Sequence, residues 1–396
     1  MCATNLRLMM KQKTTSSNNL AVSRRGFLTN SGISATTAWT IIKPESIRGS
    51  SANSAISVGL LGTGGRGSRV AGYAQTNARG RVTALCDLFD DQIEKAKRKI
   101  EVPNAATYRD MDKLLSSDID AVIIATPPFE HPRMLSAAVQ ANKHIYCEKP
   151  MGVDAEGCRL VIEASRRHKP DKCLSTGFQQ RYGKGYLEAY RRLQAGDLGQ
   201  LTIASASWIS GDPFQLRSYD DPAEHKLRNW FAYRDYSGDI IVEQDCHNFD
   251  VLHWFIGSLP TRVVGYGGTK VRKQMEIMDH LSLSFEFPDG MHVNFEANQI
   301  TPRGFRRIGE RFTGTKGTVE TSRSRMIHYR AEGQPEVFLS DNDITIDAVD
   351  TFLKRIETGN VENVGERSAL STLMAILGRT AIYENREATW LGEFGG

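Results

Sequence analysis

The run VGLLGTGGRG, residues 58–67, constrains the fold more than any other part of the sequence. An apolar segment of strand length, 56–61, breaks into three glycines with the spacing GxGxxG, and a helical stretch follows over 68–75. The first glycine permits a tight turn, the second lets backbone amides approach a pyrophosphate, and the third lets the helix pack on the strand. The free N–H groups at the helix N-terminus then face the phosphates. The predicted cofactor contacts here are Gly62, Gly64, Gly65, Arg66 and Gly67.

Glycine clusters also form ordinary loops, so the residues that follow decide between the two readings. A second apolar run, 81–86, ends in Asp87, twenty positions after the third glycine. A carboxylate at this spacing accepts hydrogen bonds from the adenine ribose and repels a 2′-phosphate. Leu88 and Phe89 come next, so no arginine directly follows to bind such a phosphate. The pattern favours NAD over NADP, and the alternative role of Asp87 is to cap a helix over 90–100.

Strand-like and helix-like segments then alternate over 121–125, 132–141, 144–147, 154–167 and 173–176. This alternation predicts a doubly wound parallel sheet, an α/β Rossmann fold, with ligands bound at the carboxyl ends of the strands. Because successive strand residues point to opposite faces, Glu148 and Lys149 are not expected to face the site together. A surface lysine at a loop is the alternative for Lys149. The predicted cofactor contacts at these strand ends are Thr126, Pro127, His131, Glu148 and Lys149.

The segments ATPPFEH (125–131) and HIYCEKPMG (144–152), behind the glycine run, resemble the Gfo/Idh/MocA family of oxidoreductases. The resemblance extends from residue 56 to the C-terminus. It implies that Lys149 lies beside the nicotinamide and the substrate hydroxyl, often with a cis bond before Pro150. It also implies a helix with an aspartate and, four residues later, a histidine. The histidine is His247, and Glu243 stands in the place of the aspartate.

On a continuous helix Glu243, His247 and Asp250 share one face, so two carboxylates are expected to flank the imidazole. Such neighbours favour the protonated ring and can orient it as a general base. A lone histidine on a helix is more often structural, but the family motif and Lys149 favour a catalytic role. The predicted catalytic residues are Lys149, His247 and Glu243.

After residue 182 strand-like segments dominate, at 201–208, 261–267, 281–287 and 291–297, and helices are expected at 344–357 and 365–385. The sequence Pro288-Asp289-Gly290 predicts an antiparallel hairpin between the last two of these strands. We therefore predict a Rossmann domain over 55–177 and an α+β substrate domain over 178–396 with a mostly antiparallel open sheet. By the resemblance, the uncovered face of that sheet forms homo-oligomer contacts.

The start of the second domain and a later aromatic loop supply the predicted substrate contacts. Relatives contact substrate at the first of these, and aromatic rings in the second could stack on a sugar, although aromatic residues more often belong to a core. The predicted substrate contacts are Gln180, Arg181, Tyr182, Asp250, Trp230 and Tyr233.

Residues 1–54 contain SRRGFL (23–28), a weakly apolar run over 32–42 and a stretch of small polar residues. This arrangement resembles a bacterial twin-arginine signal, which directs folded proteins to the periplasm or outside the cell. The apolar run is too short and too polar to span a bilayer. A disordered basic tail with a chance arginine pair is the alternative.

Composition excludes several other classes of protein. With 40% hydrophobic and 24% charged residues the chain is globular. The chain has a net charge of +4, but residues 1–54 hold seven basic residues and one acidic residue, a charge of +6, which leaves −2 for the rest. The basic excess lies in the leader, so no nucleic-acid partner is expected. The six cysteines form no CxxC pair, and no metal-ligand cluster is apparent, so most cysteines are expected to be buried and no metal is required.

These features predict an NAD-dependent oxidoreductase acting on a sugar or polyol. His247 removes the hydroxyl proton, hydride passes to the nicotinamide, and Lys149 steadies the charge on the oxygen. Outside the cytoplasm no pool exchanges spent cofactor, so the NAD is expected to stay bound and to be recycled within the enzyme. One alternative is a redox-neutral NAD-dependent glycoside hydrolase that uses the same residues. The other is a non-catalytic secreted carbohydrate-binding protein, which would be expected to have lost the catalytic groups.

Overall fold

The structure is a computed structural model that describes residues 55–302 and 304–395. The SRRGFL motif lies outside the described residues, so the twin-arginine prediction stands on the sequence alone. Within the described ranges no helix is both long and apolar enough to cross a membrane.

Six parallel strands form the first sheet, in the order β3-β2-β1-β4-β5-β6. This confirms the doubly wound parallel sheet. The strand order changes direction between β1 and β4, which makes their carboxyl ends the place where a ligand binds in such folds. The strands are β1 (Ile56–Leu61), β2 (Gly80–Cys86), β3 (Ala106–Tyr108), β4 (Ala121–Ile124), β5 (His144–Cys147) and β6 (Leu174–Thr176). The helices of this half are α1 (Gly65–Thr76), α2 (Asp90–Ile100), α3 (Met111–Leu115), α4 (His131–Gln140) and α5 (Ala155–Arg167).

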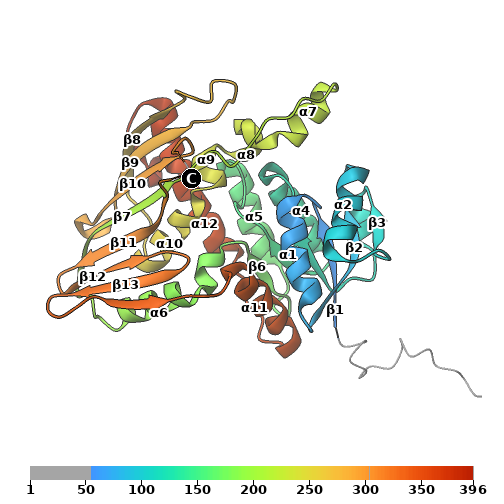
Figure 1. The fold of residues 1–396 in the computed structure, drawn as a ribbon, viewed down its shortest axis with the longest axis horizontal. Helices are drawn as coiled ribbons and strands as arrows, with labels where there is room; N and C mark the ends of the chain where they lie inside the picture. The colour runs from blue at the N-terminus through green and yellow to red at the C-terminus, as the bar shows by residue number, and fades with distance from the viewer. Residues whose placement is uncertain (1–54, 303, 396) are drawn as a thin grey trace, which may run out of the picture. The chain divides into compact units, whose positions relative to one another are not determined.

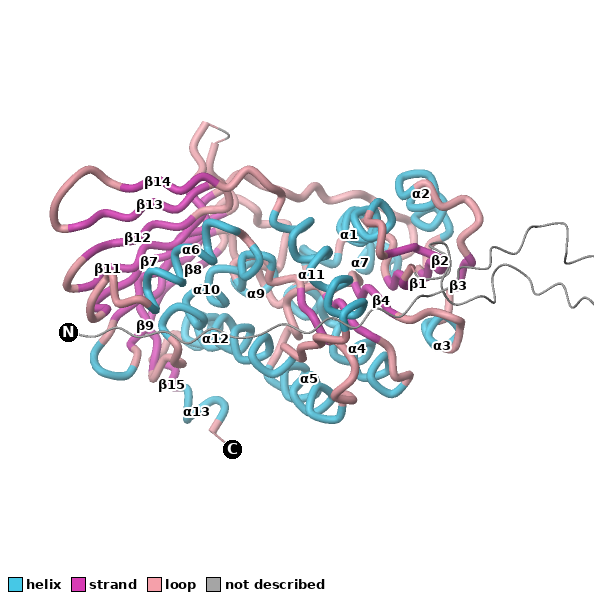
Figure 2. The backbone as a smooth tube through the Cα atoms, turned by 90° about the horizontal axis from the view of Figure 1, so that it is seen from below, coloured by secondary structure: helices cyan, strands magenta, loops and turns pink. Residues whose placement is uncertain are grey.

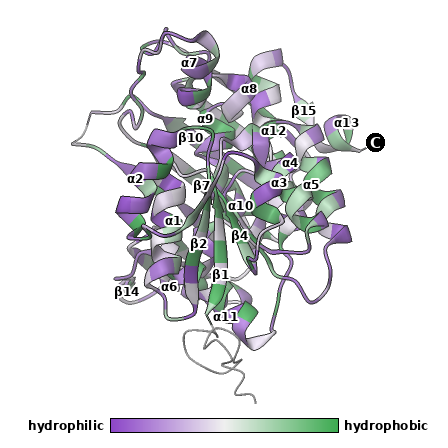
Figure 3. Cartoon of the chain, turned by 90° about the vertical axis from the view of Figure 1, so that its right-hand side faces the viewer, coloured by the Kyte–Doolittle hydropathy of each residue, from purple (hydrophilic) through white to green (hydrophobic). Residues whose placement is uncertain are grey.

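The central strands of this sheet are buried on both faces, which is why they read as continuous apolar runs. All four residues of β4 and of β5 are buried. In Figure 3 β1 and β4 are coloured largely hydrophobic, whereas α2 at the outside is hydrophilic. The described cysteines, Cys86, Cys147, Cys158, Cys173 and Cys246, are all buried and free, as predicted for most of them.

Nine strands form the second sheet, in the order β14-β13-β12-β11-β7-β10-β9-β8-β15. Every neighbouring pair is antiparallel except β7 and β10, so the sheet is mostly antiparallel as predicted. The predicted hairpin is the pair β9 and β10. The strands are β7 (Leu201–Ile209), β8 (Arg262–Gly268), β9 (His280–Glu286), β10 (His292–Asn298), β11 (Arg307–Gly314), β12 (Gly317–Thr321), β13 (Arg325–Arg330), β14 (Glu336–Leu339) and β15 (Ala388–Thr389).

Helices cover one face of the second sheet and leave the other open. Figures 1 and 2 show α10 and α12 between this sheet and the first sheet. Every second residue near the end of β7 fits this arrangement, because Ala204, Ala206 and Trp208 are all buried and lie on the covered face. The helices of this half are α6 (Lys184–Gln194), α7 (Pro222–Arg228), α8 (Arg234–Ser237), α9 (Ile240–Glu243), α10 (Cys246–Ile256), α11 (Ile344–Thr358), α12 (Gly365–Glu384) and α13 (Trp390–Phe394).

Helix α11 returns from the second half of the chain to pack on the first sheet. Its buried Phe352 meets the Tyr146 ring of β5 edge-on, with ring centres 5.6 Å apart. Arg79, just before β2, forms ion pairs with Asp350 and Glu357 of α11. The first sheet is therefore completed by a helix that lies more than 150 residues further along the chain. The boundary at 177 between the two predicted domains remains a prediction.

Candidate functional site

The glycine loop after β1 has the shape that a pyrophosphate needs. Gly62 has φ +86°, and a Cβ there would lie 2.6 Å from the Ala125 carbonyl oxygen at the end of β4. A Cβ on Gly67 would collide with the Gly62 carbonyl oxygen, so α1 can approach the loop this closely only with glycine there. By contrast, a Cβ on Gly64 or Gly65 would meet no atom within 4 Å. The loop therefore leaves open space beside its own backbone.

The N-terminus of α1 supplies donors to that space. Gly64 is its N-cap, no side chain caps the helix, and no acidic residue stands in its first turn. The N–H groups of the first turn therefore remain for an anion, and the helix dipole favours one there. These residues fit the phosphates of a dinucleotide.

Asp87 is the first residue after β2 and lies directly beside the glycine loop. The Thr63 N–H and hydroxyl both donate to its Oδ2, at 2.7 and 2.9 Å, and the Phe89 N–H donates to its Oδ1 at 3.1 Å. Phe89, rather than Asp87, is the N-cap of α2, so the alternative role of Asp87 as that helix's cap is wrong. The carboxylate therefore lies beside the glycine loop, and its contact with the ribose stays a prediction.

Arg66 of the glycine loop is bound to Glu148 at the end of β5. The Arg66 Nε donates to Glu148 Oε1 at 2.9 Å, and its Nη2 donates to Gln179 at 3.0 Å. Burial lowers the pKa of Arg66, but the Glu148 carboxylate outweighs it and the pKa is raised. Both predicted cofactor contacts are thus engaged with each other, and Arg66 joins the cradle to the strand end that carries Lys149.

His131, a predicted cofactor contact, is held by the protein itself. Its Nδ1 lies 2.7 Å from the Pro150 carbonyl oxygen, and its Nε2 lies 2.9 Å from the Thr126 carbonyl oxygen. Both ring nitrogens thus lie at main-chain carbonyl oxygens, and a cofactor contact by His131 stays a prediction. The ring ties the end of β4, with Thr126 and Pro127, to the cis Lys149–Pro150 peptide after β5. The Thr126 backbone nitrogen in turn borders Gly62.

The side chain of Lys149 extends from the end of β5 in the first sheet to Glu243 at the end of α9. Its Nζ donates to the Glu243 carboxylate at 2.8 Å and to the Glu243 main-chain carbonyl. Burial lowers the pKa of Lys149, but the Glu243 carboxylate more than offsets it, so the pKa is raised and the lysine is charged. An ammonium group has three protons, and these two contacts leave one for a further acceptor.

His247 lies in an aromatic and cationic environment instead of between two carboxylates. Its ring stacks on Trp208 with centres 5.7 Å apart and planes 13° apart, and Phe178 meets it edge-on at 6.1 Å. Burial and the positive charges of Lys149, Arg323 and Arg66 hold its pKa well below 6.5. The prediction that flanking carboxylates favour the protonated ring is therefore wrong. The neutral ring is ready to accept a proton.

A break in the helix separates the three residues that were expected to share a face. Helix α9 ends at Glu243 and α10 begins at Cys246. Between them the Asp245 N–H donates to the Ile240 carbonyl five residues back, one residue further than in a regular α-helix. One additional residue rotates everything after it by about 100°. In the structure Glu243 binds Lys149, and no carboxylate is among the charges that act on the His247 ring.

The other predicted carboxylate, Asp250, belongs to a separate ion pair. Arg181 donates to both of its oxygens, at 2.7 and 2.9 Å, and the Ser371 hydroxyl donates to one of them. Arg181 and Tyr182 line a cavity of about 330 Å³ together with Trp254. Lys149 and His247 are not among the residues that line it. The prediction of Arg181 and Asp250 as substrate contacts is not supported by this geometry.

The remaining predicted substrate residues are divided. Gln180 is buried, and its side-chain oxygen has no partner among the described residues, so it can still take a polar ligand. The Trp230 ring packs against Phe214, and the Tyr233 ring lies under Lys226. No ring contact joins either aromatic to His247 within residues 55–302 and 304–395. The aromatic ring that does reach His247 is Trp208.

Trp208 is the site residue that the sequence analysis missed. It stands at the end of β7 after two inward alanines, so the period-two pattern does place it on the covered face. Its Nε1 is buried with no partner in the described part of the chain, and the same holds for Nδ1 of His247. Buried polar atoms are normally paired, so these orphan atoms indicate a place for polar ligand groups or water.

Two family models match the chain. One, described as "Oxidoreductase family, NAD-binding Rossmann fold", matches residues 56–178. The other, described as "GFO/IDH/MocA C-terminal domain", matches residues 186–320. Residues 56–178 are accordingly an NAD-binding Rossmann domain, which agrees with the open glycine loop and with Asp87.

The proteins similar to this chain include several dehydrogenases. Inositol 2-dehydrogenase of Salmonella paratyphi B is 26% identical over 312 residues, covering 77% of this chain and 87% of that protein. Myo-inositol 2-dehydrogenase of Thermotoga maritima is 23% identical over 351 residues, covering 83% and 97%. A structure of levoglucosan dehydrogenase with NADH and levoglucosan matches with a TM-score of 0.72 at 17% identity, covering 84% of this chain and 99% of that chain. At this last identity the likeness shows the fold.

Three glycine variants separate the two functions of the cradle. Gly67→Ala is expected to lower the free energy of unfolding by about 1–3 kcal/mol or more, because its Cβ collides with backbone. Gly64→Ala is expected to unfold like the wild type after nucleotide removal but to bind NAD at least about tenfold more weakly, because its Cβ fills the phosphate space. Denaturant titration and NAD titration measure both. Gly72→Ala, also open but further along α1, is the control and is expected to keep NAD affinity.

Glu243→Gln tests the charge pair at Lys149. Without the carboxylate, burial is expected to depress the lysine pKa below its unfolded value of about 10.4, so stability is lost as pH falls below that value. The free energy of unfolding is expected to fall by about 3–5 kcal/mol at pH 6 and by less at pH 9. Denaturant titration at both pH values measures this. Equal losses in Glu243→Gln and in the exposed control Glu276→Gln would contradict the pair.

Proposed function

Because the chain is an NAD-binding oxidoreductase of the Gfo/Idh/MocA family, we propose that it oxidises a hydroxyl group of a sugar or polyol. The observation that carries the proposal is that the charge of Lys149, held by Glu243, acts on the buried His247 ring together with that of Arg66 from the NAD cradle. The names of the relatives support the substrate class, since they include inositol and levoglucosan dehydrogenases.

The chain's own groups divide the chemistry between them. His247 accepts the proton of the substrate hydroxyl, which its depressed pKa permits at neutral pH. The remaining proton of the Lys149 ammonium group donates to the same oxygen as negative charge develops there. The bound nicotinamide supplies a hydride acceptor. Glu243 touches no substrate in this scheme and acts as a positioning residue that keeps Lys149 charged and in place.

The leader and its SRRGFL motif support a second part of the proposal. The protein is exported folded, with NAD retained as a prosthetic group; the hydride taken from one sugar or polyol would be passed to a second sugar, which is reduced, before the next turnover. Export places it in the periplasm or outside the cell. Nucleotide that remains bound through purification of the mature protein is the expected sign, and a nucleotide-free protein with weak NAD affinity would contradict retention.

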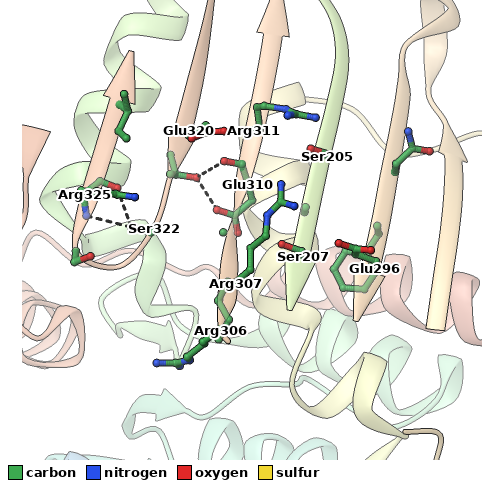
Figure 4. Close-up of a pocket in the computed structure, with 18 of the residues that line it drawn as sticks. Ser205, Ser207, Glu296, Arg306, Arg307, Glu310, Arg311, Glu320, Ser322 and Arg325 are labelled. Atoms are coloured by element: carbon green, nitrogen blue, oxygen red, sulfur yellow. Dashed lines mark hydrogen bonds between the residues drawn. The ribbon is translucent and has the colours of Figure 1, made fainter. Parts of the chain in front are cut away.

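The open face of the second sheet supports a homo-oligomer. A cavity of about 670 Å³ on this face is lined by Ser205 and Ser207 of β7 and by Arg307 and Arg311 of β11, which Figure 4 shows. Tyr266, near the end of β8, is 79% exposed. We propose that a second copy of the chain covers this face, which protects the strands and the exposed ring. A solution mass equal to that of a single chain would contradict it.

One experiment tests the activity and distinguishes its redox outcome. The mature protein is assayed with free sugars, polyols and glycosides, without added NAD, while products and absorbance at the reduced-nicotinamide band are followed. A simple dehydrogenase is expected to raise that absorbance once per bound cofactor and then stop. Turnover of a glycoside with no net absorbance change would replace the dehydrogenase with the redox-neutral glycoside hydrolase.

Two alanine variants test the residues. His247→Ala is expected to lower turnover by about 10²–10⁴-fold, the range for loss of a general base. Lys149→Ala is expected to lower it by about 10²–10³-fold. The controls are His292→Ala and Lys184→Ala, which remove exposed side chains of the same types. Full turnover by Lys149→Ala would overturn the mechanism, and loss of turnover by every variant alike would show only unfolding, which circular dichroism detects.

A further inference from the structure

Arg323 is an exposed cation in the turn between β12 and β13. Its guanidinium carbon lies 5.7 Å from the centre of the Trp208 ring. Within residues 55–302 and 304–395 it forms no ion pair with a carboxylate. An arginine offers five N–H donors in a rigid fork, so this one has its donors free for a ligand.

The position of Arg323 places it at the candidate site. Trp208, over which it lies, also stacks on His247. Its positive charge is one of three that act on the His247 ring, after Lys149 and before Arg66. A substrate whose hydroxyl meets His247 and Lys149 therefore has Arg323 within reach of its other substituents, across the Trp208 ring.

The other two cations that act on His247, Lys149 and Arg66, each form an ion pair with a glutamate. Lys149 is matched by Glu243 at 2.8 Å, and Arg66 is matched by Glu148 at 2.8 Å. Asp245 is buried with no hydrogen-bond partner in residues 55–302 and 304–395, and burial raises the pKa of its carboxyl well above the usual value. Arg323 has no such ion pair in the described residues: the nearby buried Glu310 carboxyl accepts hydrogen bonds from Asn248 and Thr321, and burial raises its pKa to about 7.

We propose that the substrate is an anionic sugar whose carboxylate or ester oxyanion is bound by Arg323. This inference rests on the proposed function, because it assigns the substrate class of the same site. A guanidinium fork binds two oxygens of such a group at once, with hydrogen bonds about twice as strong as those between neutral groups. Trp208 holds the guanidinium by a cation–π contact, so the fork is partly fixed before the substrate arrives.

Binding measurements test the proposal independently of turnover. Calorimetry on the NAD-loaded protein compares methyl glucoside with methyl glucuronide and with methyl glucoside 6-sulfate, and then repeats the series with galactose. The acidic member of at least one pair is expected to bind about tenfold or more tightly than its neutral partner. The carboxylate and sulfate members distinguish the two sources of the anion. No preference for an acidic sugar, or no binding by any acidic sugar, overturns the proposal.

Variants on the same hairpin localise the effect. Arg323→Gln is expected to weaken binding of the acidic sugar about tenfold or more and to leave the neutral partner within about twofold, whereas Arg323→Lys keeps part of the preference. The matched control is Arg325→Gln, two residues away on the outer-face cavity, and it is expected to match the wild type. An equal effect of both glutamine variants overturns the proposal. Weaker NAD binding by Arg323→Gln, with sugar binding unchanged, also overturns it by assigning the guanidinium to the cofactor phosphates.

A failure of the proposed activity would look different. If acidic sugars bind and Arg323→Gln removes that preference, but His247→Ala keeps full turnover, the mechanism falls and the substrate class stands. If sugars are oxidised with no dependence on charge, the substrate class falls and the activity stands.

Discussion

The buried ion pair between Lys149 and Glu243 is the interaction on which the rest of the site depends. Lys149 follows β5 of the first sheet, and Glu243 ends α9 beneath the second sheet, so the pair joins the two halves of the molecule at the cofactor edge. Taking either partner away would leave a buried charge alone, which costs about 3–5 kcal/mol. The same pair fixes the ammonium group and keeps it charged, so one interaction serves both assembly and chemistry.

A second ion pair, between Arg66 and Glu148, lies at the same end of β5. Arg66 reaches from the glycine loop to Glu148, and through Gln179 and Thr345 this network extends to the short helix after β6 and to the start of α11. Adjacent residues of the β5 end, Glu148 and Lys149, thus point to different partners, as the alternation of an extended chain requires. The carboxylates of Glu148 and Glu243 both form ion pairs, so neither raises the pKa of His247. The His247 ring instead contacts Trp208 and Phe178.

Two short-range departures from regular structure set the geometry of the site. At the wide turn between α9 and α10 the Asp245 N–H donates to the Ile240 carbonyl, and Glu243 binds Lys149 there while no carboxylate charge acts on His247. Gly62 adopts a positive φ and Gly67 has no Cβ, and together these allow α1 to pack closely against the end of β4. Irregularities of this kind are common at functional sites, where local strain is compensated by the surrounding structure.

The sequence by itself determined the parallel sheet, the glycine loop, Asp87 and the β9–β10 hairpin, because each depends on periodicity or spacing between near neighbours. Strands β11–β14 were not predicted from the sequence. Charged residues such as Arg307 and Glu320 lie on their open face, so these segments lack a clear run of apolar residues. Only the tertiary structure decided which charges meet: Glu243 with Lys149, Asp250 with Arg181, and Trp208 with His247. Those partners lie far apart in the chain, and one inserted helical residue redirects a side chain, so no local pattern specifies them.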